Sequence, residues 1–175
     1  GQSIRKMLGQ LGLQRLDREG YQTLWLDLQK SDEDILAGMS TRWRNNILQS
    51  EKADLSIEWD VAGTHAPWMT GVYAADKALH KYGGPSPQFL QKYIPHLVKD
   101  GNYALGRAVS KGQPVAFVLF VKHGRSATYL TGWSEKDGQV SLAHHLLFWQ
   151  GIKMLKEQGI KELDLGDVNN DNAKG

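Results

Sequence analysis

The chain has 175 residues, of which 41% are hydrophobic and 23% charged, and its net charge is +2. This length suits one compact domain with its own core, and the composition is that of an ordinary globular protein. The absence of cysteine excludes thiol catalysis, disulfides and cysteine-ligated zinc. The longest apolar run, residues 115–121, is too short to cross a bilayer, and the first residues show no signal-peptide pattern. We therefore expect a cytoplasmic protein, with a peripheral membrane contact left open.

The first third of the chain predicts a strand, one helix and a second strand. The leucines of residues 23–28 alternate with the period of a strand, and so do the apolar residues of 55–59. Between them, Ser31 is typical of the residue that precedes a helix. Apolar residues at three-to-four spacing then carry that helix through Ile47.

Trp43 lies on the apolar stripe of that helix, so we expect its ring in the core. Arg42 and Arg44 lie about 100° to either side of it. Guanidinium groups in such positions can bind phosphate or a nucleotide. Carboxylate partners such as Glu51 or Asp54 are the alternative.

The middle of the chain predicts two helices. Apolar residues from Trp68 to Tyr82 share one face of the first helix, and Pro67 suits its first turn. The Gly- and Pro-rich segment 82–87 ends that helix. Ser86 is then typical of a residue that caps the second one.

The last part of the chain predicts strands around one long helix. Residues 103–110, 114–121 and 126–133 form an antiparallel meander with short turns. Residues 141–158 form a helix that is apolar on more than one side and is therefore buried. Residues 161–167 form a last short strand, so the predicted order is β-α-β-α-α-β-β-β-α-β.

That order is the core of the GNAT-like acyltransferase fold, an α/β (α+β) arrangement with a mixed, mostly antiparallel sheet and flanking helices. Residues 25–59, 107–133 and 143–169 together resemble the Fem family over about residues 21–170. Members of this family are aminoacyl-tRNA-dependent transferases that add amino acids to peptidoglycan precursors. The resemblance implies tRNA and a peptidoglycan precursor as partners, with aminoacyl-tRNA as the donor substrate and no resident cofactor.

Two departures from the family pattern bear on the domain organisation. Family members usually carry two GNAT-like domains and continue past the last strand found here. We therefore expect a helical segment at 1–20, followed by one GNAT-like domain at 21–175 that resembles the second domain of a longer protein and lacks its last strands. The strand at 161–167 would then have an unpaired edge, and Trp149 on the long helix would lack cover. Such a surface favours a homodimer or a cover formed by residues 1–20.

The entry to the long helix separates two donor chemistries. In CoA-using members of the fold, a glycine-rich turn and the helix N-terminus hold the pyrophosphate. Here Gly138 is present, but larger residues occupy the second glycine position. This favours a donor carried on tRNA, and a CoA thioester remains the alternative.

Two adjacent histidines open the long helix. A neutral histidine at this position can act as a general base toward an incoming amine, and packing or capping is the alternative. We assign the base to His144 and a substrate contact to His145. The resemblance adds Tyr129 as a substrate contact, because Fem relatives often have a tyrosine on the strand that faces the cleft; a role in the cleft wall is its alternative.

Asp164 and Asp167 lie at the carboxyl end of the last strand. A carboxylate there can hold the substrate amine, so we predict a catalytic role for Asp164 and a substrate contact for Asp167. Asp164 can instead bond a neighbouring backbone group. Residues 167–172 begin like a calcium loop, but Asn172 occupies the position of the required glycine, so we predict no metal site.

The leading function from sequence is transfer of an aminoacyl group from charged tRNA to an amine of a peptidoglycan precursor. Catalysis of this kind depends mainly on positioning and on stabilisation of the oxyanion. An acyl-CoA-dependent N-acyltransferase is the first alternative, and a non-catalytic binding domain of a two-domain transferase is the second. Binding of tRNA would be strongly salt-dependent.

Overall fold

The computed structural model describes residues 2–14, 22–135 and 141–167. No helix in these three ranges is both long enough and apolar enough to cross a membrane. The elements are α1 (Gln2–Gln10), β1 (Thr23–Asp27), α2 (Asp32–Gly38), α3 (Thr41–Ser50), β2 (Ser56–Asp60), α4 (Ala66–His80), α5 (Pro87–Lys99), β3 (Tyr103–Ser110), β4 (Gln113–His123), β5 (Ser126–Ser134), α6 (Ser141–Glu157) and β6 (Glu162–Asp167).

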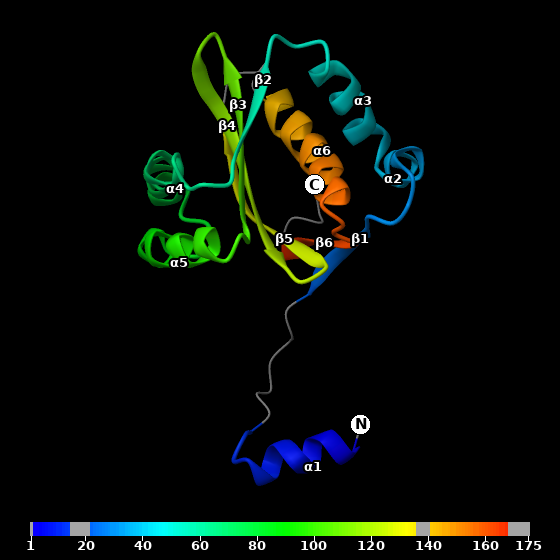
Figure 1. Cartoon of the computed structure of the whole chain (residues 1–175), viewed down its shortest axis with the longest axis vertical. Coiled ribbons are helices and arrows are strands. Elements are labelled where there is room, and N and C mark those ends of the chain that lie inside the picture. Colours follow the sequence, from blue (N-terminus) through cyan, green and yellow to red (C-terminus); the bar gives the residue numbers. More distant parts are fainter. Residues whose placement is uncertain (1, 15–21, 136–140, 168–175) are drawn as a thin grey trace.

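One six-stranded sheet organises the fold, with the strand order β1-β6-β5-β4-β3-β2. Strands β5 and β6 pair in parallel, and the other neighbouring strands pair antiparallel. Helices α2, α3 and α6 lie on one side of the sheet and α4 and α5 on the other (Figure 1). The predicted GNAT-like architecture, a mixed sheet between flanking helices, is confirmed.

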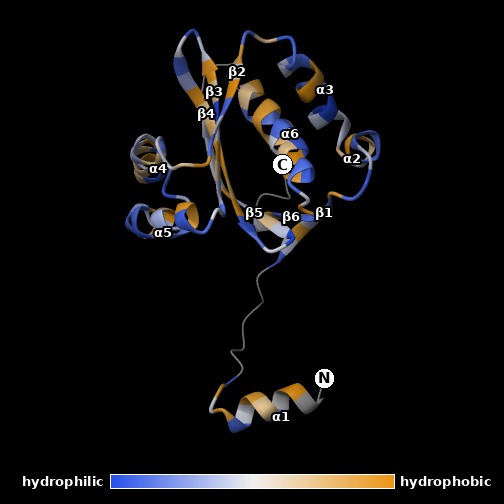
Figure 2. Cartoon of the chain, in the orientation of Figure 1, coloured by the Kyte–Doolittle hydropathy of each residue, from blue (hydrophilic) through white to orange (hydrophobic). Residues whose placement is uncertain are grey.

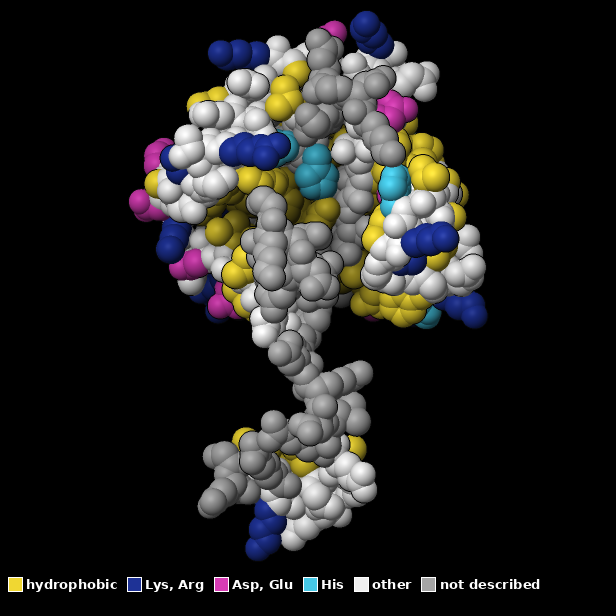
Figure 3. Space-filling view, turned by 180° about the vertical axis from the view of Figure 1, so that it is seen from behind, with side chains coloured by type: hydrophobic (Ala, Val, Ile, Leu, Met, Phe, Trp, Pro, Cys, Tyr) yellow, Lys and Arg dark blue, Asp and Glu magenta, His cyan; other side chains and the backbone are white. Residues whose placement is uncertain are grey.

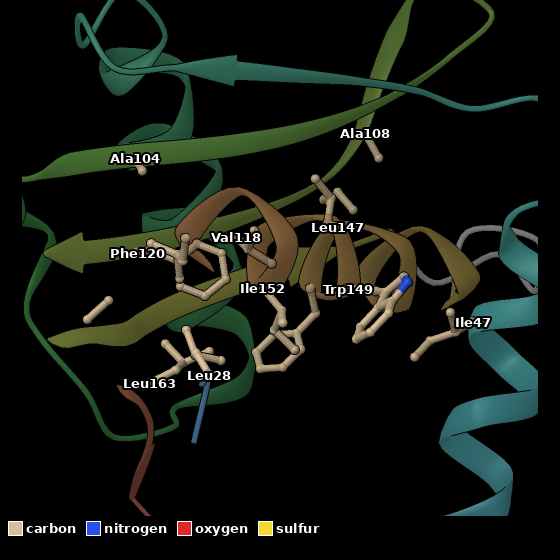
Figure 4. Packing of buried hydrophobic residues seen from close by; sticks show 14 of the residues in the cluster. Leu28, Ile47, Ala104, Ala108, Val118, Phe120, Leu147, Trp149, Ile152 and Leu163 are labelled. Atoms are coloured by element: carbon tan, nitrogen blue, oxygen red, sulfur yellow. The ribbon is translucent and has the colours of Figure 1, made fainter. Parts of the chain in front are cut away.

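Helix α6 is the centre of the larger hydrophobic core, because it packs both on the sheet and on α3. Hydrophobic residues mark the central strands and α6 (Figure 2). Trp149 of α6 points toward Ile47 of α3 and is only 2% exposed (Figure 4). The expectation that Trp149 lacks cover is therefore wrong, since α3 supplies it.

The single helix predicted from Ser31 to Ile47 is two helices. Met39 and Ser40 have extended backbones, with ψ angles of 156° and 150°, and separate α2 from α3. Ser31 caps α2 and Ser40 caps α3, each accepting a hydrogen bond from the backbone N–H three residues on, at 3.1 and 3.3 Å. A second capping serine within the apolar pattern was the signal for this break.

The two middle helices lie where the sequence predicts them. Ser86 accepts a hydrogen bond from the backbone N–H of Phe89 at 3.1 Å, which confirms the cap of α5. Lys81 has a left-handed backbone (φ 53°) and ends α4, so Tyr82 lies beyond the helix. Leu79, predicted on the buried face, is 71% exposed, because α4 rests on the sheet through its first two turns.

The edge of β6 that was expected to be open is paired with β1. Trp25 of β1 lies opposite Asp164 of β6 in an antiparallel ladder, and the hydroxyl of Thr23 donates to the Asp164 carboxylate. The expected cover by residues 1–20 is also wrong for the part that is described. The apolar side chains of this region are exposed rather than packed on α6: Ile4, Met7, Leu8, Leu11 and Leu13. Dimerisation stays a prediction.

Candidate active site

The site lies where β5 and β6 stop pairing. Their parallel ladder joins residues 126–128 to residues 162–164, and within the described ranges no pair joins the two strands beyond it. Both strands continue, β5 to Ser134 and β6 to Asp167. Tyr129 is the first residue of β5 beyond this ladder. Histidine side chains border a hollow with hydrophobic walls on the face drawn in Figure 3.

A β-bulge aims the side chains at this point of β5. Tyr129 lies opposite Phe120 of β4, whereas Leu119 lies opposite Thr131, so β5 holds one extra residue. In a regular strand, residues three apart point to opposite faces of the sheet. The bulge turns Tyr129 and Gly132 to the same face, the one covered by α6.

Tyr129 and His144 meet on that face. The phenol oxygen lies 3.5 Å from His144 Nε2, and the two rings form an edge contact with centroids 6.0 Å apart. Tyr129 also packs against Phe120 and Phe148, with centroids at 6.1 and 5.6 Å. A hydrogen bond of this length is weak, and catalytic hydrogen bonds commonly tighten when substrate binds.

Burial keeps both groups of this pair uncharged. Burial, and to a lesser degree the neighbouring His145, lowers the pKa of His144 from its usual 6.5 to about 4. Burial also raises the pKa of Tyr129 above its usual value of 10. At neutral pH the site therefore holds a neutral imidazole beside a neutral phenol, and the tautomer of the imidazole decides which of the two donates the hydrogen bond.

His145 turns away from this pair toward α3. Its Nε2 lies 3.1 Å from the side-chain amide nitrogen of Asn46, and its ring lies 4.3 Å from the ring of Trp43. An amide nitrogen can only donate, so Nε2 of His145 accepts this hydrogen bond. The predicted place of Trp43 against the core is confirmed, because its ring also packs edge-on against Phe148 at 5.6 Å.

The two arginines have different surroundings. The Arg44 guanidinium donates to the carbonyl oxygens of Ala37 and Met39 and to the Thr41 hydroxyl, so it closes the corner between α2 and α3. Arg42 is exposed. In the described part of the chain neither arginine forms an ion pair with a carboxylate.

Asp164 of β6 lies on the opposite face of the sheet from the histidines. Leu163 and Leu165 pack on the α6 side, so Asp164 between them faces the other side of the sheet. Its Oδ1 accepts hydrogen bonds from the backbone N–H of Gly166, at 2.9 Å, and from the Thr23 hydroxyl. The backbone of Asp167 lies opposite Thr23.

The helix-entry turn and the rejected calcium loop of the sequence analysis cannot be placed. Gly138 of the helix-entry turn and Asn172 of the rejected calcium loop both fall outside the described residues. Within the described ranges there is no group of three or more His, Asp or Glu side chains that could hold a metal ion. A cavity of about 540 Å³ lies between α4 and α5, and its lining has no ionisable side chain: Ala62, Gly63, Ala66, Pro67, Thr70, Gln91, Ile94, Pro95 and Val98. It offers no acid–base chemistry.

Sequence reasoning missed two residues of the site, Asn46 and Gly132. Asn46 lies three residues after Trp43, so the helical period places both side chains on the face toward α6. That spacing is visible in the sequence. Gly132 gives no such signal, because only the bulge in β5 brings it next to Tyr129.

Comparisons with known proteins agree with this fold. A family model described as an acetyltransferase (GNAT) domain matches residues 40–174. The crystal structure of FemX superposes with a TM-score of 0.73 at 13% identity, over 98% of this chain and 61% of that chain. L-PGS from Bacillus licheniformis superposes with a TM-score of 0.57 at 15% identity, over 89% of this chain and 47% of that one.

A third solved structure extends this group. It is the C-terminal domain (DUF2156) of an Agrobacterium fabrum protein designated a lysylphosphatidylglycerol synthetase, with a TM-score of 0.58 at 14% identity over 85% of this chain and 46% of that one. This chain thus spans less than two thirds of each of the three structures. A search of the curated proteins finds no relative by sequence.

Proposed function

This chain belongs to the acetyltransferase (GNAT) family, and we propose that it transfers an aminoacyl group from aminoacyl-tRNA to an amine of a peptidoglycan precursor. The observation that carries this proposal is the neutral Tyr129–His144 pair at the end of the β5–β6 ladder. The likeness to FemX over 98% of the chain supports the choice of donor and acceptor.

The reaction needs a group that takes up one proton and later gives one back. The amine nitrogen attacks the ester carbonyl carbon, and the carbonyl electron pair moves onto oxygen. When the adduct collapses, the bond to the ribose oxygen of the tRNA breaks. The nitrogen loses a proton and the ribose oxygen gains one, so a group that is neutral at rest, such as His144, can take up the first proton and return one in the second step.

The remaining predicted residues have supporting roles in this proposal. Tyr129 and His145 contact the substrates on the α6 side of the sheet. Arg42 is exposed and so can reach a tRNA phosphate, whereas the Arg44 guanidinium is already bonded to backbone carbonyls. Asp167 would contact the substrate from β6, whereas Asp164 faces the other side of the sheet and bonds Thr23 of β1.

Transfer from an acyl-CoA is the second candidate, because the matching family model is described as an acetyltransferase domain. The same neutral base would serve an amine attacking a thioester. The two donors differ in the anion that the protein must hold, a tRNA backbone or a single pyrophosphate.

A transfer assay separates the two candidates. The protein is incubated with a peptidoglycan precursor that has a free amine, and with either tRNA charged with labelled amino acids or labelled acetyl-CoA. Label that moves from tRNA to the precursor supports the proposal. Label that moves only from acetyl-CoA overturns it in favour of the second candidate, and transfer from neither donor overturns both.

A further inference from the structure

Gly132 occupies a place where no other side chain fits. A Cβ atom there would lie 2.4 Å from the Tyr129 hydroxyl, 2.7 Å from Cε1 of His144 and 3.0 Å from the carbonyl oxygen of Phe117. The backbone of Gly132 is not among those with positive φ, so its conformation does not require glycine. Glycine is needed at this position because of the space beside it.

The neighbours of Gly132 cannot easily move away. The Phe117 carbonyl belongs to β4, which is paired on both sides in the middle of the sheet. The ring of Tyr129 is packed against Phe120 and Phe148. In a close-packed interior, an added methyl group would press on the phenol oxygen and on Cε1 of His144 at once, and so would disturb the contact between the two side chains.

We propose that Gly132 is a positioning residue, which leaves room for the Tyr129 hydroxyl to donate to His144 Nε2 and so fixes the proton of the imidazole on Nδ1. This deepens the proposed function and rests on it for one step. Nε2 of His144 faces the phenol, so the proton of the attacking amine reaches it through Tyr129.

The proton balance of this relay closes. The Tyr129 oxygen accepts the proton of the adduct nitrogen while its own proton moves to His144 Nε2. The phenol stays neutral and the imidazole becomes positively charged. The same path in reverse delivers one proton to the departing ribose oxygen. Burial raises the pKa of Tyr129, which disfavours a free phenolate and so favours the concerted path.

The tautomer of His144 tests the inference without any substrate. In the chain labelled with ¹⁵N-histidine, we expect His144 to show an unprotonated Nε2 and a protonated Nδ1. Gly132→Ala and Tyr129→Phe should each shift His144 toward the Nε2–H form. In the Tyr129→Phe background, Gly132→Ala should add no further shift, because the hydroxyl it displaces is absent.

Gly106→Ala is the matched control. It also adds a methyl group to a crowded buried strand, where a Cβ would lie 2.7 Å from Trp59 and 3.0 Å from Leu147. It should leave the tautomer of His144 unchanged. If Gly132→Ala does not fold, Tyr129→Phe still tests the hydrogen bond on which the inference depends, since it removes one oxygen and keeps the ring. A His144 that keeps its Nδ1 proton in Tyr129→Phe overturns the inference, and so does an Nε2–H form in the unmodified chain.

Measurement of transfer activity tests the same inference independently. In the transfer assay, Gly132→Ala and Tyr129→Phe should each lower kcat about 10-fold or more with little change in KM, and Gly106→Ala should not. Transfer that proceeds normally in both site variants leaves the proposed function standing and removes the relay. The expected tautomers without any transfer leave the role of Gly132 standing and remove the proposed function.

Discussion

The two faces of the sheet have similar aromatic cores but use their polar groups differently. On the α4/α5 face, the buried Tyr73 and Asp60 bond to the backbone: the Tyr73 hydroxyl donates to the Pro85 carbonyl at 2.8 Å, and Asp60 accepts from three backbone N–H groups. On the α6 face, side chains bond to one another, as His145 does with Asn46 and Tyr129 with His144.

This difference indicates where chemistry can occur. A side chain that holds a loop by its backbone cannot change partners without unfolding that loop, so it serves stability. A long contact between two neutral side chains can be replaced by contacts with a substrate at little cost. We therefore expect the chemistry on the α6 face, with the α4/α5 face as its support.

Removing the base should have the largest effect. We expect His144→Ala to lower kcat of aminoacyl transfer about 1,000-fold, because a positioned general base typically contributes between 100- and 10,000-fold. Tyr103→Phe is the control on the opposite face, where the buried hydroxyl has no hydrogen-bond partner in the described part of the chain. It should leave kcat unchanged. A His144→Ala protein that keeps more than a tenth of the rate would contradict the assignment of the chemistry to the α6 face.

Asp60 tests the supporting face. It is 8% exposed, and its carboxylate accepts hydrogen bonds from the backbone of Ala62, Thr64 and His65, just before α4. Asp60→Ala leaves three backbone donors without this acceptor, and we expect the free energy of unfolding to fall by about 3 kcal/mol. Urea denaturation measures the loss. The tautomer of His144 should not change, and a change would show that the two faces are coupled.

The pH dependence of stability reports on His144 in the folded protein. Its folded pKa of about 4 lies below its usual value of 6.5, so between these values the unfolded chain binds a proton that the folded chain does not. The free energy of unfolding should therefore fall as the pH drops from about 6.5 to about 4, by on the order of 3 kcal/mol. Urea titrations across this range measure the slope. His144→Gln should flatten it, and an equal slope in both proteins would contradict the lowered pKa.

The sequence predicted the sheet and its helices well because each element has a local signal. Period-two leucines marked β1, and serine caps marked α2 and α5. The pairing of β1 with β6 was missed because it joins residues about 140 positions apart, and no local pattern encodes that contact.

The candidate site was only partly visible for a similar reason. His144 and Tyr129 were identifiable by residue type and by resemblance. Their contact depends on the extra residue of β5, which turns Gly132 toward them, and a bulge of this kind leaves no period in the sequence. Arg44 bonds to the carbonyl oxygens at the end of α2 only because the chain breaks between α2 and α3. The sequence did not predict this role, because the apolar stripe runs through the break.

The smallest expected effects separate Arg42 from Arg44, which the sequence treated alike. Arg44→Met removes the donors to the carbonyls at the end of α2, and we expect a loss of about 1 kcal/mol in the free energy of unfolding. Arg42→Met should leave stability unchanged, because the side chain is exposed.

Binding to tRNA should show the opposite order. If Arg42 contacts one phosphate, Arg42→Met makes the negative slope of log K against log salt concentration shallower by about 0.7 to 0.9. Arg44→Met should leave that slope in place, since its guanidinium is already bonded to carbonyl oxygens. Filter binding at several salt concentrations measures both slopes. Equal slopes for Arg42→Met and the unmodified chain would show that Arg42 does not contact the tRNA. A shallower slope for Arg44→Met would show that Arg44 leaves its bonds at the α2–α3 corner to contact the nucleic acid.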